Sequence, residues 1–136
     1  MGMDDTAVEA SGAASGGVKI LLRCEGLALF LGACALYDIL SGQWWLFVVL
    51  FLAPDLSFLA YLIGPRSGAR VYNAVHTTIA PIVLLGIGAA LSMPLALEIA
   101  IIWLAHIGLD RTLGYGLKYE SGFGFTHLGR IGHASR

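Results

Sequence analysis

Residues 95–115, LALEIAIIWLAHIGLDRTLGY, are the stretch that decides the fold. This apolar run is long enough to cross a hydrocarbon core of about 30 Å as a helix. Its second half nevertheless carries His106, Asp110 and Arg111. Ionisable side chains inside a membrane helix are rare and costly, so they indicate a functional site by default. We therefore expect a membrane helix that presents polar groups to its partner helices.

The composition of the whole chain is that of a membrane protein. Hydrophobic residues make up 57% of the 136 residues, charged residues only 12%, and the mean hydropathy is +0.79. These values are too apolar for an average soluble domain, and the length predicts one domain. Because the formal net charge is only -1, the chain offers no basic surface to nucleic acid, and neither DNA nor RNA is an expected partner.

Four apolar runs predict four transmembrane helices, at residues 21–40, 44–63, 72–91 and 95–115. Between the second and third runs, residues 64–70 (GPRSGAR) read as a polar loop because they contain two helix breakers. The predicted fold class is therefore all-α: an integral membrane bundle of four helices within residues 18–116, with the lipid bilayer as its partner.

The two ends of the chain differ from the bundle in composition. Residues 1–17 are acidic, small and rich in Gly, Ser and Ala, which predicts a disordered tail. Residues 117–136 alternate glycine with aromatic and basic residues, which favours a cytoplasmic segment at the membrane interface. A second interpretation is a lid that folds under the bundle and offers Thr126 and His127 to the polar groups.

The distribution of positive charge predicts the orientation of the bundle. The lysines and arginines all lie at the N-terminal flank, in the second connection or at the C-terminal end: Lys19, Arg23, Arg66, Arg70, Arg111, Lys118, Arg130 and Arg136. Four spans place these three regions on one side, and the positive-inside rule makes that side the cytoplasm. We expect a multi-pass protein of the bacterial inner membrane with both termini cytoplasmic.

With the direction settled, the depth of each polar residue follows from a rise of 1.5 Å per residue. Glu25 and His76 lie about 6 Å deep, Asp110 about 7 Å, Asp55 about 12 Å and His106 about 14 Å. Each helix thus contributes to one polar layer. Pro54 and Pro81 cannot donate to the carbonyls four residues earlier, so each predicts a kink, about 13 Å deep. A polar pocket at the kinks is the expected result.

His106 and Asp110 lie one helical turn apart and share a face. In one interpretation the carboxylate accepts a hydrogen bond from the imidazole and orients it, leaving the other ring nitrogen for a metal or a proton. In the other, both are direct ligands, and His76 and Asp55 complete a set of two nitrogens and two oxygens. Such a set suits zinc or another divalent transition metal.

Structural roles compete with this interpretation at each position. Asp55 can cap the helix broken at Pro54 or pair with Arg111, and Glu25 can pair with Arg23. His76, with Asn73, can be an interhelical hydrogen-bonding peg. A small bundle needs far fewer buried charges than these five residues supply, and this favours a functional layer for the set as a whole.

Several motifs resemble a known family. They are Pro54-Asp55-Leu56-Ser57, the stretch 72–76, the stretch 105–111 with 114–119, and Phe125-Thr126-His127-Leu128-Gly129. Over about residues 21–130 the chain is similar to domain-of-unknown-function family 4260, a group of small bacterial membrane proteins. The resemblance implies a compact multi-span protein and no particular activity. A fainter similarity links the chain to membrane-bound metal-dependent hydrolases, which carry scattered His and Asp residues and a Thr-His step.

The sequence leaves an enzyme and a non-catalytic protein both open. The first hypothesis is a site of Asp55, His76, His106 and Asp110, with Glu25 and His127 as further candidates, that binds a divalent metal for hydrolysis of an amphiphilic substrate. The alternatives are a small proton-linked carrier, haem held by His76 and His106, and a structural or partner-binding protein. Pairs of small residues, such as Ala28 with Gly32 and Gly86 with Ala90, permit close contacts within the bundle or in a homo-oligomer.

Overall fold

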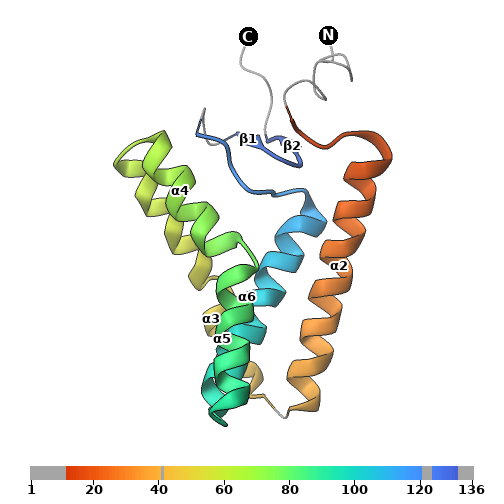
Figure 1. Ribbon diagram of the computed structural model, residues 1–136, viewed down its shortest axis with the longest axis vertical. Coiled ribbons are helices and arrows are strands. Elements are labelled where there is room, and N and C mark those ends of the chain that lie inside the picture. The colour runs from red at the N-terminus through yellow and green to blue at the C-terminus, as the bar shows by residue number, and fades with distance from the viewer. Residues whose placement is uncertain (1–11, 41, 121–123, 132–136) are drawn as a thin grey trace.

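The computed structural model describes residues 12–40, 42–120 and 124–131 of the chain. Four helical segments run alternately up and down, and the start of α2 and the described C-terminal segment lie at the same end of the bundle (Figure 1). The segments are α2 (Gly16–Ile39), α3 (Trp44–Phe51) continued by the 3-10 helix η1 (Ala53–Leu62), α4 (Pro65–His76) followed by α5 (Ile79–Ala90), and α6 (Pro94–Leu113). The predicted all-α bundle of four helices is confirmed.

Three of these segments are long and apolar enough to cross a membrane: Gly16–Ile39, Trp44–Leu62 and Pro65–Ala90. Their outward faces carry large hydrophobic side chains, as expected of surfaces in contact with lipid. The fourth, α6, has 20 residues, which span about 30 Å. It carries Glu98, Asp110 and Arg111 along with its apolar residues.

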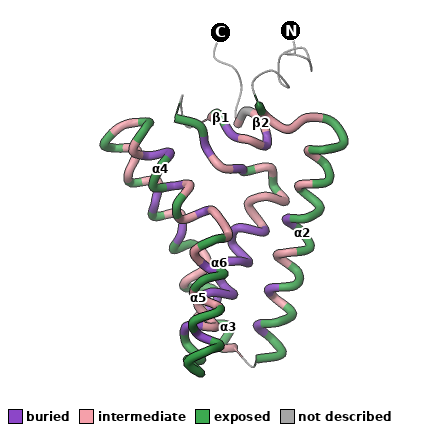
Figure 2. The backbone as a smooth tube through the Cα atoms, in the orientation of Figure 1, coloured by how far each residue is buried: buried purple, intermediate pink, exposed green. Residues whose placement is uncertain are grey.

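Helix α6 lies at the centre of the bundle. It holds most of the buried backbone in Figure 2, whereas α2 and α5 are largely exposed. Nine of its residues are buried: Ala96, Ala100, Ile101, Ile102, Leu104, Ala105, His106, Ile107 and Gly108. Because the helix is enclosed by protein, its polar side chains can face other side chains instead of lipid.

A glycine contact brings α2 against α6. A Cβ atom at Gly108 would lie 2.6 Å from the backbone nitrogen of Phe30 and 2.8 Å from the carbonyl oxygen of Gly26. A Cβ atom at Gly26 would meet the side chain of Arg111 at 2.7 Å. The two backbones therefore touch at this point, as small residues permit in membrane helices. The predicted small-residue positions Gly32 and Gly86 have open space around them instead.

Both predicted kinks are present. Pro54 lies where the α-helix α3 gives way to the 3-10 helix η1, and Pro81 lies in the first turn of α5 just after the chain breaks at Thr77. Thr77 has an extended ψ of 148°. The physical cause is the one expected, because proline removes a backbone donor and its ring crowds the preceding turn.

The predicted polar loop at residues 64–70 is wrong beyond Gly64, because α4 already begins at Pro65. Pro65 occupies the first helical position, where its missing N–H costs nothing, and Gly64 turns the chain with a φ of 152°. Gly68 then packs directly against the ring of Tyr61, where any Cβ atom would clash. Residues that break one helix here start the next.

The C-terminal segment lies across the end of the bundle between α4 and α2 (Figure 1). It contains a two-stranded hairpin, β1 (Phe125–Thr126) paired with β2 (Gly129–Arg130). Asn73 on α4 binds the backbone of Lys118 twice, donating to its carbonyl at 2.7 Å and accepting from its N–H at 2.6 Å. On the other side, the N–H of Ala14 donates to the carbonyl of His127 at 2.7 Å.

The predicted N-terminal tail, residues 1–17, falls only partly on described residues. Residues 1–11 lie outside them. Residues 12–15 precede α2 and contact the C-terminal segment, and Gly16 and Gly17 already belong to the helix.

Candidate metal centre

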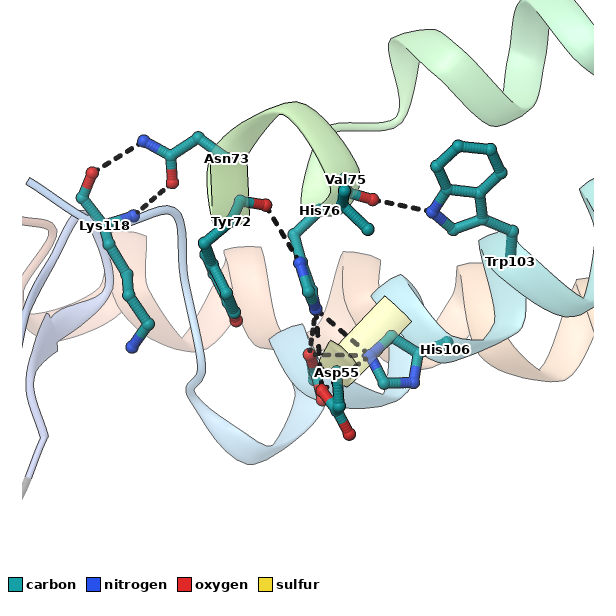
Figure 3. A network of polar contacts seen from close by, with 9 residues as sticks. Asp55, Tyr72, Asn73, Val75, His76, Trp103, His106 and Lys118 are labelled. Atoms are coloured by element: carbon teal, nitrogen blue, oxygen red, sulfur yellow. Dashed lines mark hydrogen bonds and ion pairs between the residues drawn. The ribbon is translucent and has the colours of Figure 1, made fainter. Parts of the chain in front are cut away.

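Four ionisable side chains meet at the centre of the bundle. Asp55 comes from η1, His76 is the last residue of α4, and His106 and Asp110 lie one turn apart on α6. Figure 3 shows the two imidazoles and Asp55 converging on one point. The imidazole side chains are 3–4% exposed, whereas those of Asp110 and Asp55 are 19% and 37% exposed. The group is therefore buried on its histidine side and open on its carboxylate side.

The donor atoms are close enough to share one ion. The Nε2 atoms of His76 and His106 lie 3.2 Å apart. Oδ1 of Asp55 is 3.7 Å from the first of them and 3.3 Å from the second. Oδ2 of Asp110 is 3.5 Å and 3.2 Å from the same two atoms. Each oxygen is thus nearly equidistant from the two imidazole nitrogens.

These separations match those of a tetrahedral metal site. A zinc ion held at about 2.0–2.1 Å from each of four donors separates neighbouring donors by about 3.3–3.4 Å. Five of the six donor separations are 3.2–3.7 Å, close to that geometry, and all four donor atoms lie within 4.8 Å of one another. Imidazole nitrogen and carboxylate oxygen are also donors that zinc and neighbouring divalent metals accept. The residues therefore fit a divalent ion.

The backbone of α4 orients His76 for this role. Its Nδ1 lies 2.9 Å from the carbonyl oxygen of Tyr72, four residues earlier. A carbonyl can only accept, so Nδ1 carries the proton and Nε2 presents its lone pair to the group. The ring of Tyr72 stacks on the imidazole at 3.8 Å with an angle of 9° between the planes. A partner of this kind on the second ring nitrogen is a regular feature of metal-binding histidines.

Asp110 meets His106 at the nitrogen that also faces the other donors. Its Oδ2 lies 3.2 Å from Nε2 of His106, and the same Nε2 faces His76 and Asp55. This contact fits an Asp110 that accepts a hydrogen bond from the ring, and it also fits an Asp110 that shares an ion with it. The rear nitrogen, Nδ1 of His106, is buried and has no hydrogen-bond partner among the described residues.

The two helix breaks place Asp55 and His76. Asp55 directly follows Pro54, and His76 directly precedes the break at Thr77. The break also frees the carbonyl of Val75, which accepts a hydrogen bond from Nε1 of Trp103 on α6 at 2.6 Å (Figure 3). This bond ties the end of α4 to α6 next to the group.

Two further candidates from the sequence lie elsewhere. Glu25 is exposed on α2, because its neighbour Gly26 is the residue that faces α6 and successive helical residues point about 100° apart. His127 is held by the C-terminal segment, where the N–H of Leu117 donates to its Nδ1 at 2.8 Å. Burial lowers the pKa of His127 below its usual value. Thr126 is also buried, but its hydroxyl donates to the carbonyl of Gly129.

The family assignment agrees with the motifs in the sequence. The family described as "Domain of unknown function (DUF4260)" matches residues 19–131, which include all four residues of the group. The chain belongs to this family. No curated protein and no solved structure matches it. The chemistry of this DUF4260 protein is therefore inferred from the arrangement of these four side chains.

The geometry of this DUF4260 protein also bears on the haem hypothesis. Axial histidines lie on opposite faces of a porphyrin, so its plane must pass between them. Here the carboxylate oxygens of Asp55 and Asp110 lie between the two imidazoles, at 3.2–3.7 Å from both nitrogens. They occupy the space that the plane would need, so the arrangement does not suit haem.

Sequence reasoning missed one residue beside the centre of this DUF4260 protein. The sequence places Lys118 among the positive charges of the membrane interface. In the structure its side chain is only 3% exposed, and its Nζ lies 4.8 Å from the centre of the Tyr72 ring. Its position between Tyr115 and Tyr119 is the signal in the sequence, since a lysine flanked by aromatic residues is suited to cation–π contacts.

Proposed function

We propose that this protein is a metal-dependent membrane hydrolase whose divalent ion, zinc in the first instance, is held by His76, His106 and Asp110, with Asp55 beside the position left for water. The observation that carries the proposal is the set of donor separations of 3.2–3.7 Å among residues from three different helical segments. A small bundle gains no stability from burying such a group without a cation, because unpaired polar groups away from water are costly.

The exposure of the four side chains supports a reactive site over a purely structural one. Structural zinc sites are closed, whereas catalytic ones keep a position open for water or substrate. Here the two imidazoles are enclosed and the carboxylates border a cavity of about 330 Å³. A bound divalent ion supplies Lewis acidity, which activates water near neutral pH and polarises an ester oxygen.

The side chains of the group suggest how a hydrolysis would be divided among them. His76 and His106 would hold the ion in place, because both imidazoles are enclosed by protein and the Tyr72 carbonyl fixes the ring of His76. Asp55 is the most exposed of the four and takes a proton from the attacking water. The water oxygen bonds to the acyl carbon or phosphorus, the ester bond breaks, and the leaving oxygen takes up that proton.

The membrane setting suggests the substrate and the compartment. The centre lies within the apolar bundle, so a substrate that itself resides in the bilayer reaches it most directly. Lys19, Arg66 and Lys118 lie at the end of the bundle where α2 and α4 begin, and we propose that this end faces the cytoplasm of a bacterial inner membrane.

Metal analysis of the purified full chain tests the proposal. Wild-type protein in detergent, loaded with zinc and dialysed, is expected to retain one ion per chain. His106→Ala and His76→Gln each remove an imidazole donor and are expected to lose the ion, because a single histidine and the carboxylates bind it too weakly to survive dialysis. Glu25→Gln is the matched control, since it removes a charge at a similar position along the bundle but on the exposed face of α2.

The outcomes separate the proposal from its alternatives. Retention in wild type and Glu25→Gln, with loss in both histidine variants, supports it. A wild-type protein that binds none of zinc, manganese or iron overturns it and favours a group that shares protons, as in a carrier. Equal retention in all four proteins places the ion elsewhere and overturns it as well.

A further inference from the structure

The open side of the His/Asp group faces a polar cavity of about 330 Å³. Its lining includes both carboxylates of the group, the rings of Phe58 and Tyr72, and Lys118. Part of the wall therefore comes from the C-terminal segment, through Lys118 and Ile131, whereas the predicted Thr126 and His127 do not line it. A ligand in this cavity would touch the carboxylates on one side and a lysine on the other.

Lys118 is held firmly in this wall. Its backbone is fixed by the two hydrogen bonds to Asn73, and its Nζ lies 4.8 Å from the Tyr72 ring and 5.9 Å from the Phe58 ring. Burial lowers the pKa of Lys118 to about 8, so the ammonium form still predominates at neutral pH. A buried cation at the edge of a cavity is suited to an anionic head group, since charge-assisted hydrogen bonds are the strong ones.

A second cavity, of about 310 Å³, is lined by residues that neighbour the group in the chain. Its wall is apolar and includes Pro54, Val75, Ile99, Ile102 and Trp103. Pro54 and Val75 directly precede Asp55 and His76 in the chain, and Trp103 lies one turn before His106. The wall of the apolar cavity is therefore made partly of residues next to the His/Asp group in the chain, whereas the other cavity has Asp55 and Asp110 in its wall. A volume of this size is typical of small-ligand sites.

We propose that the two cavities together bind one anionic amphiphile, with a phosphate head against Lys118 and its hydrocarbon chain in the apolar cavity. This inference rests on the proposed function, because it places the ester bond that joins head and chain beside the His/Asp group. Each end of the ligand meets a complementary surface. The anionic head lies against the buried cation of Lys118, and the hydrocarbon chain lies against apolar side chains.

Photolabelling of the full, zinc-loaded chain in dodecyl maltoside tests the inference. The probe is dodecyl phosphate with a diazirine at the end of its chain. We expect saturable labelling of residues 50–54 or 99–103, because these segments line the apolar cavity. Unlabelled dodecyl phosphate is expected to compete, whereas inorganic phosphate and dodecyltrimethylammonium are not, since the first lacks the chain and the second has the wrong charge.

Two variants separate the head site from the chain site. Lys118→Met removes the cation and is expected to weaken labelling at least about tenfold, the loss expected from one charged hydrogen bond. Lys19→Met removes the chain's other lysine and is the matched control, with labelling unchanged. Ile102→Trp fills the apolar cavity and is expected to abolish labelling of residues 99–103 while zinc stays bound.

Zinc content, measured on the same samples, distinguishes failure of this inference from failure of the proposed function. If zinc is bound but labelling is non-saturable, spread over lipid-facing residues or equal in Lys118→Met and Lys19→Met, the two-cavity site is overturned and the metal centre stands. Competition by inorganic phosphate as strong as by dodecyl phosphate reduces the site to a phosphate site and also overturns it. Wild-type protein without zinc overturns the proposed function whatever the labelling.

Discussion

His76 and His106 face each other with their Nε2 atoms 3.2 Å apart, although thirty residues separate them in the chain. Because Nδ1 of His76 donates to the Tyr72 carbonyl, its Nε2 can only accept. The two facing nitrogens therefore need a proton or a metal ion between them. The carboxylate oxygens at 3.2–3.7 Å add negative charge to the same point. A neutral His106 donating from its Nε2–H, or a bound cation, satisfies Nε2 of His76, and the two carboxylates favour the cation.

Nitrogen chemical shifts test how the two histidines bind. In zinc-loaded protein labelled with nitrogen-15, we expect both imidazoles to coordinate through Nε2 and His76 to keep its proton on Nδ1. The Tyr72 carbonyl fixes the first ring, and the converging Nε2 atoms dictate the second. Zinc affinity is expected to fall as the pH falls, since protons compete for the same nitrogens. Coordination through Nδ1 of either ring would contradict the geometry.

The glycine contact between α2 and α6 predicts a strong effect of one methyl group. Gly108→Ala would place a Cβ atom 2.6 Å from the nitrogen of Phe30, so the helices must separate. We expect a loss of about 1–3 kcal/mol in the free energy of unfolding, typical of overpacking. Gly32→Ala is the control, because that position has open space and alanine favours a helix. Unfolding in mixed micelles measures both, and equal stability of the two variants would contradict the close contact.

The attachment of the C-terminal segment predicts unequal roles for two polar residues. Asn73→Ala removes both hydrogen bonds to Lys118 in a partly buried setting, at a cost of about 1–3 kcal/mol. Limited proteolysis is therefore expected to cut residues 114–131 faster in this variant. Glu120→Gln removes exposed ion pairs with Arg66 and Arg70, which lower the pKa of Glu120 but contribute little stability. Faster cleavage in Glu120→Gln than in Asn73→Ala would reverse this order.

His127 predicts how the C-terminal segment responds to acid. Its pKa is lowered by burial, and the N–H of Leu117 donates to Nδ1, which must stay unprotonated to accept. Below the ordinary histidine pKa of about 6.5, the unfolded segment binds a proton that the folded segment resists. The stability of the segment is therefore present above that pH and is lost as the pH falls.

Hydrogen exchange at the Leu117 amide measures this response. Exchange corrected for its intrinsic rate is expected to quicken between pH 6.5 and 5. His127→Gln, which cannot be protonated, is expected to remove the dependence. A pH-independent protection of Leu117 in the wild type would contradict the role of His127.

Much of this architecture was predictable because it depends on properties local to the chain. Apolar length predicts each helix, the prolines at 54 and 81 predict the breaks, and counting residues from the positive end predicts a shared polar layer. The rise per residue along a helix is constant, so the depth of a residue below the end of its helix can be counted from the sequence. The family motifs could be read in the same way, and the match over residues 19–131 agrees with them.

Only the tertiary structure decided which members of the layer meet. Rotation about each helix axis is set by packing against the neighbouring helices, which sequence depth does not contain. Glu25 lies on the wrong face of α2, because Gly26 is the residue that touches α6. The same packing turns Asp55, His76, His106 and Asp110 toward one point and brings Lys118, far along the chain, to the cavity beside them.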